Sequence, residues 1–218
     1  MKIELLKGDC LEEMKKMSDQ SVDFSFTSPP YNRKRNDKYE NYRDIVDAYL
    51  GLLVSSTNEM LRITRGKVFI NIQKNYYNSI DVYSFIGKYA EKIREIIIWE
   101  KSNPMPAAGL SITNAYEFVI VLGNDSSSLK SNNTYTKNII TTSVNSKMPK
   151  NHKAVMHQDV SDWFIEKFTK KGDIVLDCFM GTGTTGISCK SLERGFIGIE
   201  IDSEYFKMAT EKLSTKKV

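Results

Sequence analysis

The stretch Asp173–Ile201 constrains the fold more than any other part of this 218-residue chain. It begins with the apolar run 174–176, typical of a buried strand, and ends with a second strand-like run, 196–201. Three glycines between these runs have the spacing G-x-G-x-x-G and open a helical segment: Gly181, Gly183 and Gly186. Glycines at such a turn permit a tight bend and a close approach of a ligand to the backbone. A strand, a glycine turn, a helix and a second strand predict an α/β fold with a parallel sheet.

The same alternation of strands and helices extends over the rest of the chain. Short apolar or alternating runs predict strands at Ile3–Leu6, Val22–Thr27, Lys67–Ile72, Glu95–Glu100 and Tyr116–Leu122. Helical spacing of apolar residues predicts helices at Leu11–Met17, Asp44–Leu61, Ile80–Ile93, Val160–Phe168 and Ser203–Leu213. Only one strand and one helix follow the glycine turn, so most of the sheet must come from the N-terminal part in a permuted order. We expect one domain over residues 1–218, with helices on both faces of the sheet.

Composition and charge narrow the class of protein. A hydrophobic share of 40% and a charged share of 27% are those of a soluble globular protein, and the net charge of +4 permits nucleic-acid binding without requiring it. The N-terminus is too charged for a signal peptide and no apolar run reaches membrane-spanning length, so we expect a cytoplasmic protein without a membrane partner. Three cysteines without metal-ligand spacing suggest reduced thiols: Cys10, Cys178 and Cys189. His152 and His157 have no cysteine or acidic cluster nearby, so we expect no metal site.

A second distinctive stretch follows the expected strand Val22–Thr27. Pro29 and Pro30 end this strand because neither residue has an N–H group to donate to a neighbouring strand. The resulting stiff loop lies at the carboxyl end of a strand, where open α/β sheets bind their ligands. It offers the Ser28 hydroxyl, proline carbonyls and the flat ring of Tyr31, which together suit a planar base with an amino group. Taken alone, the Pro-Pro-Tyr motif is equally expected at a simple turn or in a proline-rich peptide ligand.

The glycine turn indicates a nucleoside-bearing cofactor. Glu200 ends the second strand of this unit, where an acid can hold ribose hydroxyls. NAD would place a pyrophosphate over the turn, which the carboxylates of Asp177 and Glu200 disfavour, although Glu200 alone is also expected for NAD. S-adenosylmethionine carries an ammonium and a sulfonium and suits Asp177 better. A phosphate-binding loop of the Gly-Lys-Ser/Thr type is excluded, because no such sequence follows the glycines.

Two polar segments interrupt the α/β pattern. Residues 124–150 are rich in serine, threonine, asparagine and lysine and form either a disordered surface loop or a small target-recognition insertion. Residues 32–43 combine arginines and lysines with tyrosines directly behind the Ser-Pro-Pro-Tyr loop. They form either a solvated loop or a lid that contacts phosphates.

The two distinctive stretches together resemble the DNA amino-methyltransferases. The resemblance rests on Thr27-Ser-Pro-Pro-Tyr-Asn32, on the glycine turn Asp177–Gly186 and on Phe-Ile-Gly-Ile-Glu200, in the order of the subgroup whose catalytic loop precedes its cofactor loop. It implies a Rossmann-like fold that depends on S-adenosylmethionine, with a mostly parallel seven-stranded sheet, one antiparallel strand and a circularly permuted order. One departure is that His152 is followed by lysine where the family usually has His-Pro, and that His157 replaces a second proline.

The resemblance also implies roles for individual residues. The catalytic loop would hold a base flipped out of double-stranded DNA, because its amine cannot be reached inside a stacked duplex. In this arrangement the base lies on Tyr31, and its amine donates hydrogen bonds to Ser28 and the Pro29 carbonyl; the catalytic residues are Ser28, Pro29, Pro30 and Tyr31. The expected cofactor contacts are Asp9 and Cys10 at the adenine, Glu200 at the ribose, and Asp177, Phe179, Gly181, Gly183, Thr184 and Thr185 at the methionine and ribose end.

The first residue of the loop favours cytosine as the target base. In the resembled family a serine at this position tends to accompany N4-methylcytosine, and an aspartate or asparagine N6-methyladenine, so Ser28 indicates the former and adenine is the alternative. RNA as substrate, a nicotinamide-dependent dehydrogenase and a non-catalytic nucleic-acid-binding protein are more remote alternatives. The sequence leaves open the target site, a homodimer and a cognate restriction nuclease.

Overall fold

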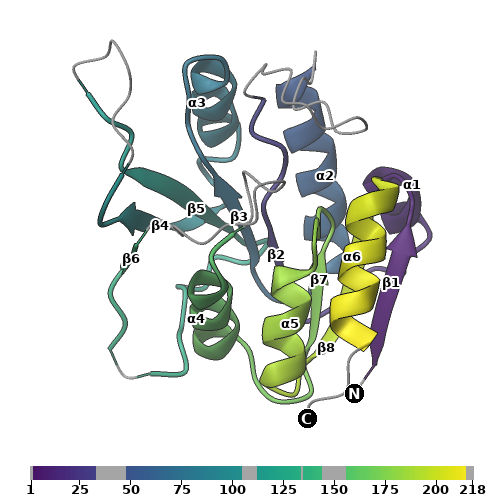
Figure 1. Ribbon diagram of the computed structural model, residues 1–218. Helices are drawn as coiled ribbons and strands as arrows, with labels where there is room; N and C mark the ends of the chain where they lie inside the picture. Colours follow the sequence, from purple (N-terminus) through teal and green to yellow (C-terminus); the bar gives the residue numbers. More distant parts are fainter. Residues whose placement is uncertain (1, 33–47, 105–111, 134, 144–155, 215–218) are drawn as a thin grey trace.

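A computed structural model describes residues 2–32, 48–104, 112–133, 135–143 and 156–214. Its strands are β1 (Ile3–Lys7), β2 (Phe24–Thr27), β3 (Val68–Ile72), β4 (Ile93–Lys101), β5 (Tyr116–Leu122), β6 (Ile139–Thr142), β7 (Ile174–Asp177) and β8 (Gly195–Glu200). Its helices are α1 (Cys10–Lys15), α2 (Tyr49–Ile63), α3 (Ser79–Lys88), α4 (Gln158–Phe168), α5 (Thr184–Ser191) and α6 (Ser203–Ser214). The strands form one sheet in the order β1-β8-β7-β2-β3-β5-β4-β6, with helices on both faces (Figure 1).

The pairing of the strands confirms the predicted fold class. β5 runs antiparallel to both of its neighbours, β3 and β4, and the other pairs of adjacent strands are parallel. The sheet has eight strands where seven were expected, because residues 139–142 add β6 to the edge of the sheet. The isoleucine pair in the polar segment accounts for this strand, since Ile140 is buried beside β4.

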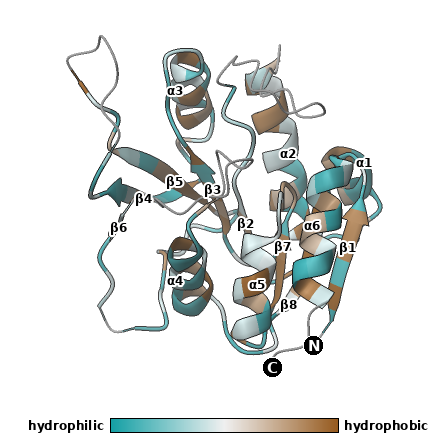
Figure 2. Cartoon of the chain, viewed as in Figure 1, coloured by the Kyte–Doolittle hydropathy of each residue, from teal (hydrophilic) through white to brown (hydrophobic). Residues whose placement is uncertain are grey.

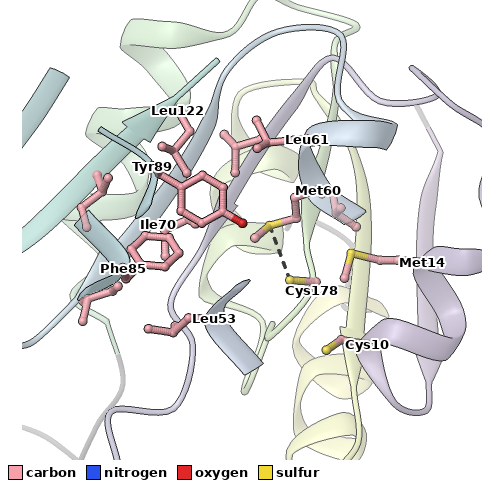
Figure 3. Close-up of a cluster of buried hydrophobic side chains, with 14 of the residues drawn as sticks. Cys10, Met14, Leu53, Met60, Leu61, Ile70, Phe85, Tyr89, Leu122 and Cys178 are labelled. Carbon is pink, nitrogen blue, oxygen red and sulfur yellow. Dashed lines mark hydrogen bonds between the residues drawn. The ribbon is translucent and has the colours of Figure 1, made fainter. Parts of the chain in front are cut away.

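Each face of the sheet carries its own hydrophobic core. The helices α1, α2 and α3 cover one face, where Met60 packs against Leu53 and Phe85 and lies 3.6 Å from the sulfur of Cys178 (Figure 3). The helices α4, α5 and α6 cover the other face, and the rings of Phe26 and Phe164 lie 4.8 Å apart there. The hydropathy of the helices follows this division, because their apolar residues lie mainly toward the sheet (Figure 2). The three cysteines are buried and unpaired.

Some element boundaries differ from the predicted ones. The helix expected over Ile80–Ile93 ends at Lys88, because residues 89–92 form a turn closed by a bond from the Lys92 amide to the Tyr89 carbonyl. Ile93 then begins β4. The expected start of α2 at Asp44 lies outside the described residues. No helix in the described ranges is both long enough and apolar enough to span a lipid bilayer.

Residues 124–133 and 135–143 follow the edge of the sheet and are not a detached loop. Asp125 pairs with Lys67, and Arg94 donates a hydrogen bond of 2.6 Å to the Asp125 carbonyl. Asn132 donates to the last carbonyls of α4, at Glu166 and Thr169. For its described part, therefore, the reading of residues 124–150 as a disordered surface loop is wrong.

Candidate active site at the carboxyl edge of the sheet

The two distinctive motifs of the sequence lie side by side at the carboxyl ends of β2 and β7. These strands are adjacent and parallel, with Ser25 opposite Leu176, so the loop after β2 meets the glycine turn after β7. The hydroxyl of Thr27 donates a hydrogen bond of 2.7 Å to Asp177 and accepts one of 3.2 Å from the Phe179 amide. Thr27 directly precedes Ser28, and these bonds therefore fix the catalytic-loop candidate to the cofactor-turn candidate.

The three glycines of the turn serve different physical purposes. Gly181 has φ of 53°, and a Cβ atom built there meets no heavy atom within 4 Å among the described residues. Gly183 has φ of 85° and begins α5, and its Cβ position lies 3.1 Å from the Cβ of Ala209. A Cβ at Gly186 would lie 2.7 Å from the ring of Phe196. Of the three, only Gly181 leaves space over the backbone for a ligand, and Gly183 and Gly186 permit close packing of α5.

Asp177 lies beneath the turn rather than on its surface. Its side chain is 4% exposed and accepts hydrogen bonds from the hydroxyls of Thr27 and Thr185, at 2.7 Å each, and from the Phe179 amide. Burial raises the pKa of Asp177 to about 6, although the hydrogen bonds from Thr185, Thr27 and the Phe179 amide act in the opposite direction. The protein thus holds a buried carboxylate without a cationic partner among the described residues, next to the turn.

Glu200 connects the end of β8 to the same turn. One carboxylate oxygen accepts from the Gly181 amide and the other from the Asp202 amide, both at 2.8 Å. Burial is the main cause that raises the pKa of Glu200, and the two backbone hydrogen bonds lower it. A carboxylate has about four lone-pair sites, so Glu200 can accept further hydrogen bonds from ligand hydroxyls.

Asp9 and Cys10 follow β1, the strand next to β8. The Gly8 amide donates to the Glu200 carbonyl at 3.1 Å, which places this segment beside the ribose-site candidate. However, the carboxylate of Asp9 caps α1 by accepting from the Leu11 and Glu12 amides. The thiol of Cys10 packs into the core, and burial raises its pKa to about 12. Neither side chain points plainly at a ligand, so a contact with adenine would involve the backbone or the edge of these residues.

The remaining residues of the turn have mixed surroundings. Phe179 is half-buried and packs on the core, Thr184 is half-buried at the start of α5, and Thr185 is buried on Asp177. The hydroxyl of Thr182 is buried without a hydrogen-bond partner among the described residues. A buried hydroxyl is normally paired, so Thr182 leaves a polar group of the turn for a bound molecule.

The loop after β2 is held by a buried polar network. Ser28 Oγ and the Tyr31 hydroxyl are 2.7 Å apart, and the Tyr31 hydroxyl donates to Glu117 Oε2 at 2.9 Å. Asn71 Nδ2 lies 2.9 Å from the Tyr31 hydroxyl and 2.8 Å from the same Glu117 oxygen. Lys101 pairs with the other carboxylate oxygen of Glu117 at 2.5 Å. The amide oxygen of Asn71 is buried without a partner among the described residues.

Two asparagines fix the backbone of this loop. Asn75 and Asn78 each donate a side-chain hydrogen bond to the Tyr31 carbonyl, at 2.7 and 2.8 Å. Asn32 has φ of 50°, a left-handed conformation that asparagine tolerates better than most residues. Pro29 is buried and Pro30 half-buried. The loop is therefore preorganised by contacts from the next strand and from the segment that follows it.

The sequence analysis did not assign a role to several of these residues. Asn71 interrupts the apolar strand β3, and Glu117 interrupts the apolar strand β5. A polar residue within a buried strand was the available signal, since such residues are normally hydrogen-bonded. Thr27 was named only as the polar member of a strand alternation, and no sequence pattern indicated its bond to Asp177.

Aromatic side chains are exposed next to the loop. Tyr76 and Tyr77, directly after Asn75, are 89% and 53% exposed. Tyr83 on α3 is also exposed, with the Lys74 ammonium 5.9 Å from its ring centroid. The expected basic lid at residues 33–43 lies outside the described residues. His157 caps α4 through a 3.3 Å bond from the Asp159 amide, and no group of three metal-ligating side chains occurs in the described ranges.

Comparison with known proteins adds a family match. Residues 22–211 match the family described as DNA methylase. The chain is 25% identical over 245 residues to Type II methyltransferase M.HinfI of Haemophilus influenzae, covering 96% of this chain and 67% of that protein. It is 28% identical over 243 residues to Type II methyltransferase M.MwoI of Methanothermobacter wolfeii, covering 100% of this chain and 36% of that protein. The chain thus spans about two thirds and about one third of these relatives.

Solved structures share the fold over the whole chain. PvuII DNA methyltransferase (cytosine-N4-specific) is similar with a TM-score of 0.82 and 18% identity, covering 100% of this chain and 88% of that chain. The M1.HpyAVI–SAM complex is similar with a TM-score of 0.69 and 26% identity, covering 98% and 100%. A DNA modification methylase of Thermus thermophilus, complexed with S-adenosyl-L-methionine, has a TM-score of 0.70 and 21% identity, covering 97% and 95%.

Proposed function

Because the chain belongs to the DNA methylase family, we propose that it is a site-specific DNA methyltransferase acting on the exocyclic N4 amine of a flipped cytosine. S-adenosylmethionine is the cofactor and DNA the substrate. The observation that supports this proposal most is the pair of hydrogen bonds of Thr27 with Asp177 and the Phe179 amide. They hold the Ser28 loop against the glycine turn, so that a base at one and a cofactor at the other can meet.

The residues around the turn fit S-adenosylmethionine. Asp177 and Glu200 are two buried carboxylates with raised pKa values, which a cationic ligand would compensate. The backbone at Gly181 is open to a ligand, and Glu200 retains acceptor capacity for ribose hydroxyls. When bound, the cofactor supplies an electrophilic methyl group on its sulfonium sulfur.

The loop after β2 suits a base with an amino group. Ser28 and the Pro29 carbonyl offer acceptors for the two amine hydrogens, and the ring of Tyr31 offers a stacking face. Hydrogen bonds from the amine to these acceptors orient the nitrogen lone pair toward the methyl group. The buried, unpaired amide oxygen of Asn71 adds a further acceptor in this region. The amine loses one proton when its nitrogen gains the methyl group.

The surface beside the loop suits duplex DNA. Tyr76 and Tyr77 are exposed aromatic rings next to the residues that hold Tyr31, where they can stack on bases adjacent to a flipped one. Residues 124–150 form the target-recognition insertion of a single domain in this proposal, with β6 as its attachment to the sheet. A cognate restriction nuclease agrees with the names of the relatives, which are Type II methyltransferases.

The choice of cytosine rests on Ser28. A hydroxyl is neutral and smaller than a carboxylate, and in the resembled family serine at this position accompanies cytosine. The test is to digest DNA from cells that express the protein to nucleosides and to separate these by mass spectrometry. N4-methylcytosine in these cells, and its absence in cells that express Ser28→Ala, is the expected result. N6-methyladenine as the sole product would overturn the cytosine assignment, and no methylated base of either kind would overturn the proposed function.

A further inference from the structure

A buried carboxylate lies at the end of a chain of hydrogen bonds that begins at the catalytic loop. We propose that Glu117 is a positioning residue that acts through Tyr31 and fixes the Ser28 hydroxyl as a hydrogen-bond acceptor for the target amine. This inference rests on the proposed function, since it concerns the way in which Ser28 receives the base. It adds Glu117, Asn71 and Lys101 to the residues on which the reaction depends.

The direction of the hydrogen bonds follows from the number of hydrogens available. The Tyr31 hydroxyl has one hydrogen and donates it to Glu117 Oε2 at 2.9 Å. The contact of 2.7 Å between Ser28 Oγ and the Tyr31 hydroxyl must then use the hydrogen of Ser28. With its hydrogen directed at Tyr31, Ser28 presents only lone pairs to a bound base.

Glu117 is held as the acceptor that this direction requires. Its side chain is 3% exposed, and Lys101 lies 2.5 Å from Oε1, on the side away from Tyr31. Asn71 Nδ2 donates to Oε2 at 2.8 Å, so both carboxylate oxygens face donors. An ionised carboxylate can only accept, and a charge buried this deeply is stable only when it is paired. The direction of the chain therefore cannot reverse while Glu117 carries its charge.

This arrangement resolves an ambiguity in the chemistry of serine. A free hydroxyl can donate or accept, and a serine that donates would compete with the amine for the Pro29 carbonyl or repel its hydrogens. An amine needs acceptors, because both of its hydrogens must be drawn away for the nitrogen lone pair to turn toward the methyl group. Glu117 thus gives a neutral serine the acceptor-only behaviour that an aspartate has by its charge.

The decisive variant is Glu117→Gln, which keeps the shape and removes the charge. The Lys101 ammonium attracts the new amide oxygen, so that the amide nitrogen faces Tyr31 and donates to it. Tyr31 then donates to Ser28, and the chain reverses. We expect the turnover number for methylation to fall about 10- to 100-fold, the range for the loss of a hydrogen bond to a charged group. Affinity for S-adenosylmethionine should stay within about twofold, because Glu117 does not contact the glycine turn.

A double-mutant cycle separates positioning from a general loss of structure. Tyr31→Phe removes only the relaying hydroxyl and should lower turnover at least tenfold by itself. In this background Glu117→Gln should cost less than about threefold more, because the connection to Ser28 is already broken. The exposed Glu91→Gln is the matched control for charge, and its turnover should equal that of the wild type.

Each result decides the question. Wild-type turnover in Glu117→Gln, or fully additive losses in the double variant, would overturn the positioning role and leave the proposed function intact. If Glu117→Gln does not fold, Tyr31→Phe carries the test, and unchanged turnover in that variant would overturn the role. No methylation by the wild type, with S-adenosylmethionine bound, would overturn the proposed function itself and this inference with it.

Discussion

Replacement of Asp177 by asparagine should make the free protein more stable while it weakens cofactor binding. The buried carboxylate has a pKa of about 6, compared with its ordinary value of 3.8. A difference of about 2 corresponds to about 3 kcal/mol, which the ionised group costs the folded state at neutral pH. Asparagine can still accept from Thr27 and the Phe179 amide through Oδ1, and its Nδ2 can donate to Thr185 after that hydroxyl turns.

The pH dependence gives this prediction a sign. The folded-state pKa lies above the unfolded one, so between pH about 4 and about 6 the folded protein binds a proton that the unfolded chain has lost. The contribution of Asp177 to the free energy of unfolding therefore falls as the pH rises through this window, and stays at its lowest value above it. Asp177→Asn should exceed the wild type by up to about 3 kcal/mol at pH 7 and by little at pH 4.

Urea denaturation at several pH values, together with calorimetry, measures both effects. The variant should bind S-adenosylmethionine more weakly by about 1.5–3 kcal/mol, because a charged hydrogen-bond partner of the turn is lost. Asp19→Asn, which removes an exposed carboxylate that pairs with Arg62, is the control and should change stability by less than about 1 kcal/mol. A variant that is less stable than the wild type by the same amount at every pH would refute the reasoning.

Three further predictions concern the same edge of the sheet. Glu200→Ala should abolish detectable binding of S-adenosylmethionine in calorimetry while the protein stays folded, because both the Gly181 amide and the ribose hydroxyls lose their acceptor; wild-type affinity would contradict this. Gly181→Ala should lower cofactor affinity more than Gly87→Ala, a control on α3 with open space around it, because φ of 53° strains alanine by about 1 kcal/mol and the added methyl group fills the ligand space; equal affinities would show that the space is not used. Tyr76→Ala should weaken binding to duplex DNA by about 1–3 kcal/mol in a fluorescence-anisotropy titration without changing cofactor affinity, and unchanged DNA binding would show that this ring does not stack on bases.

The fold was largely predictable because its signals are local. Apolar runs and the glycine spacing lie within short windows, and they gave β5 at Tyr116–Leu122 with its observed bounds and β7 and β8 within a residue. β6 was not predicted, since two isoleucines in a polar segment are too short a signal. The end of α3 was misplaced because apolar residues continue with similar spacing from the helix into β4.

The candidate site was predictable in its motifs but not in its connections. Ser28, Tyr31 and Glu200 were named from local patterns, and the structure brings them to one edge of the sheet. The bonds from Tyr31 to Asn71 and Glu117 join residues 40 and 86 positions apart, and no periodicity encodes such a pairing. Asp177 was expected at the cofactor surface, whereas its hydrogen bonds place it beneath the turn, which the spacing of glycines alone could not reveal.

Transfer of a labelled methyl group from cofactor to DNA tests the central claim most directly. Purified protein would be incubated with double-stranded DNA and S-adenosylmethionine that carries a deuterated methyl group, and the nucleosides would be analysed by mass spectrometry. The account predicts the intact deuterated methyl group on an exocyclic amine, and its loss in Ser28→Ala with cofactor affinity retained. Binding of S-adenosylmethionine and DNA by the wild type without any label in the nucleosides, or full transfer by Ser28→Ala, would contradict it.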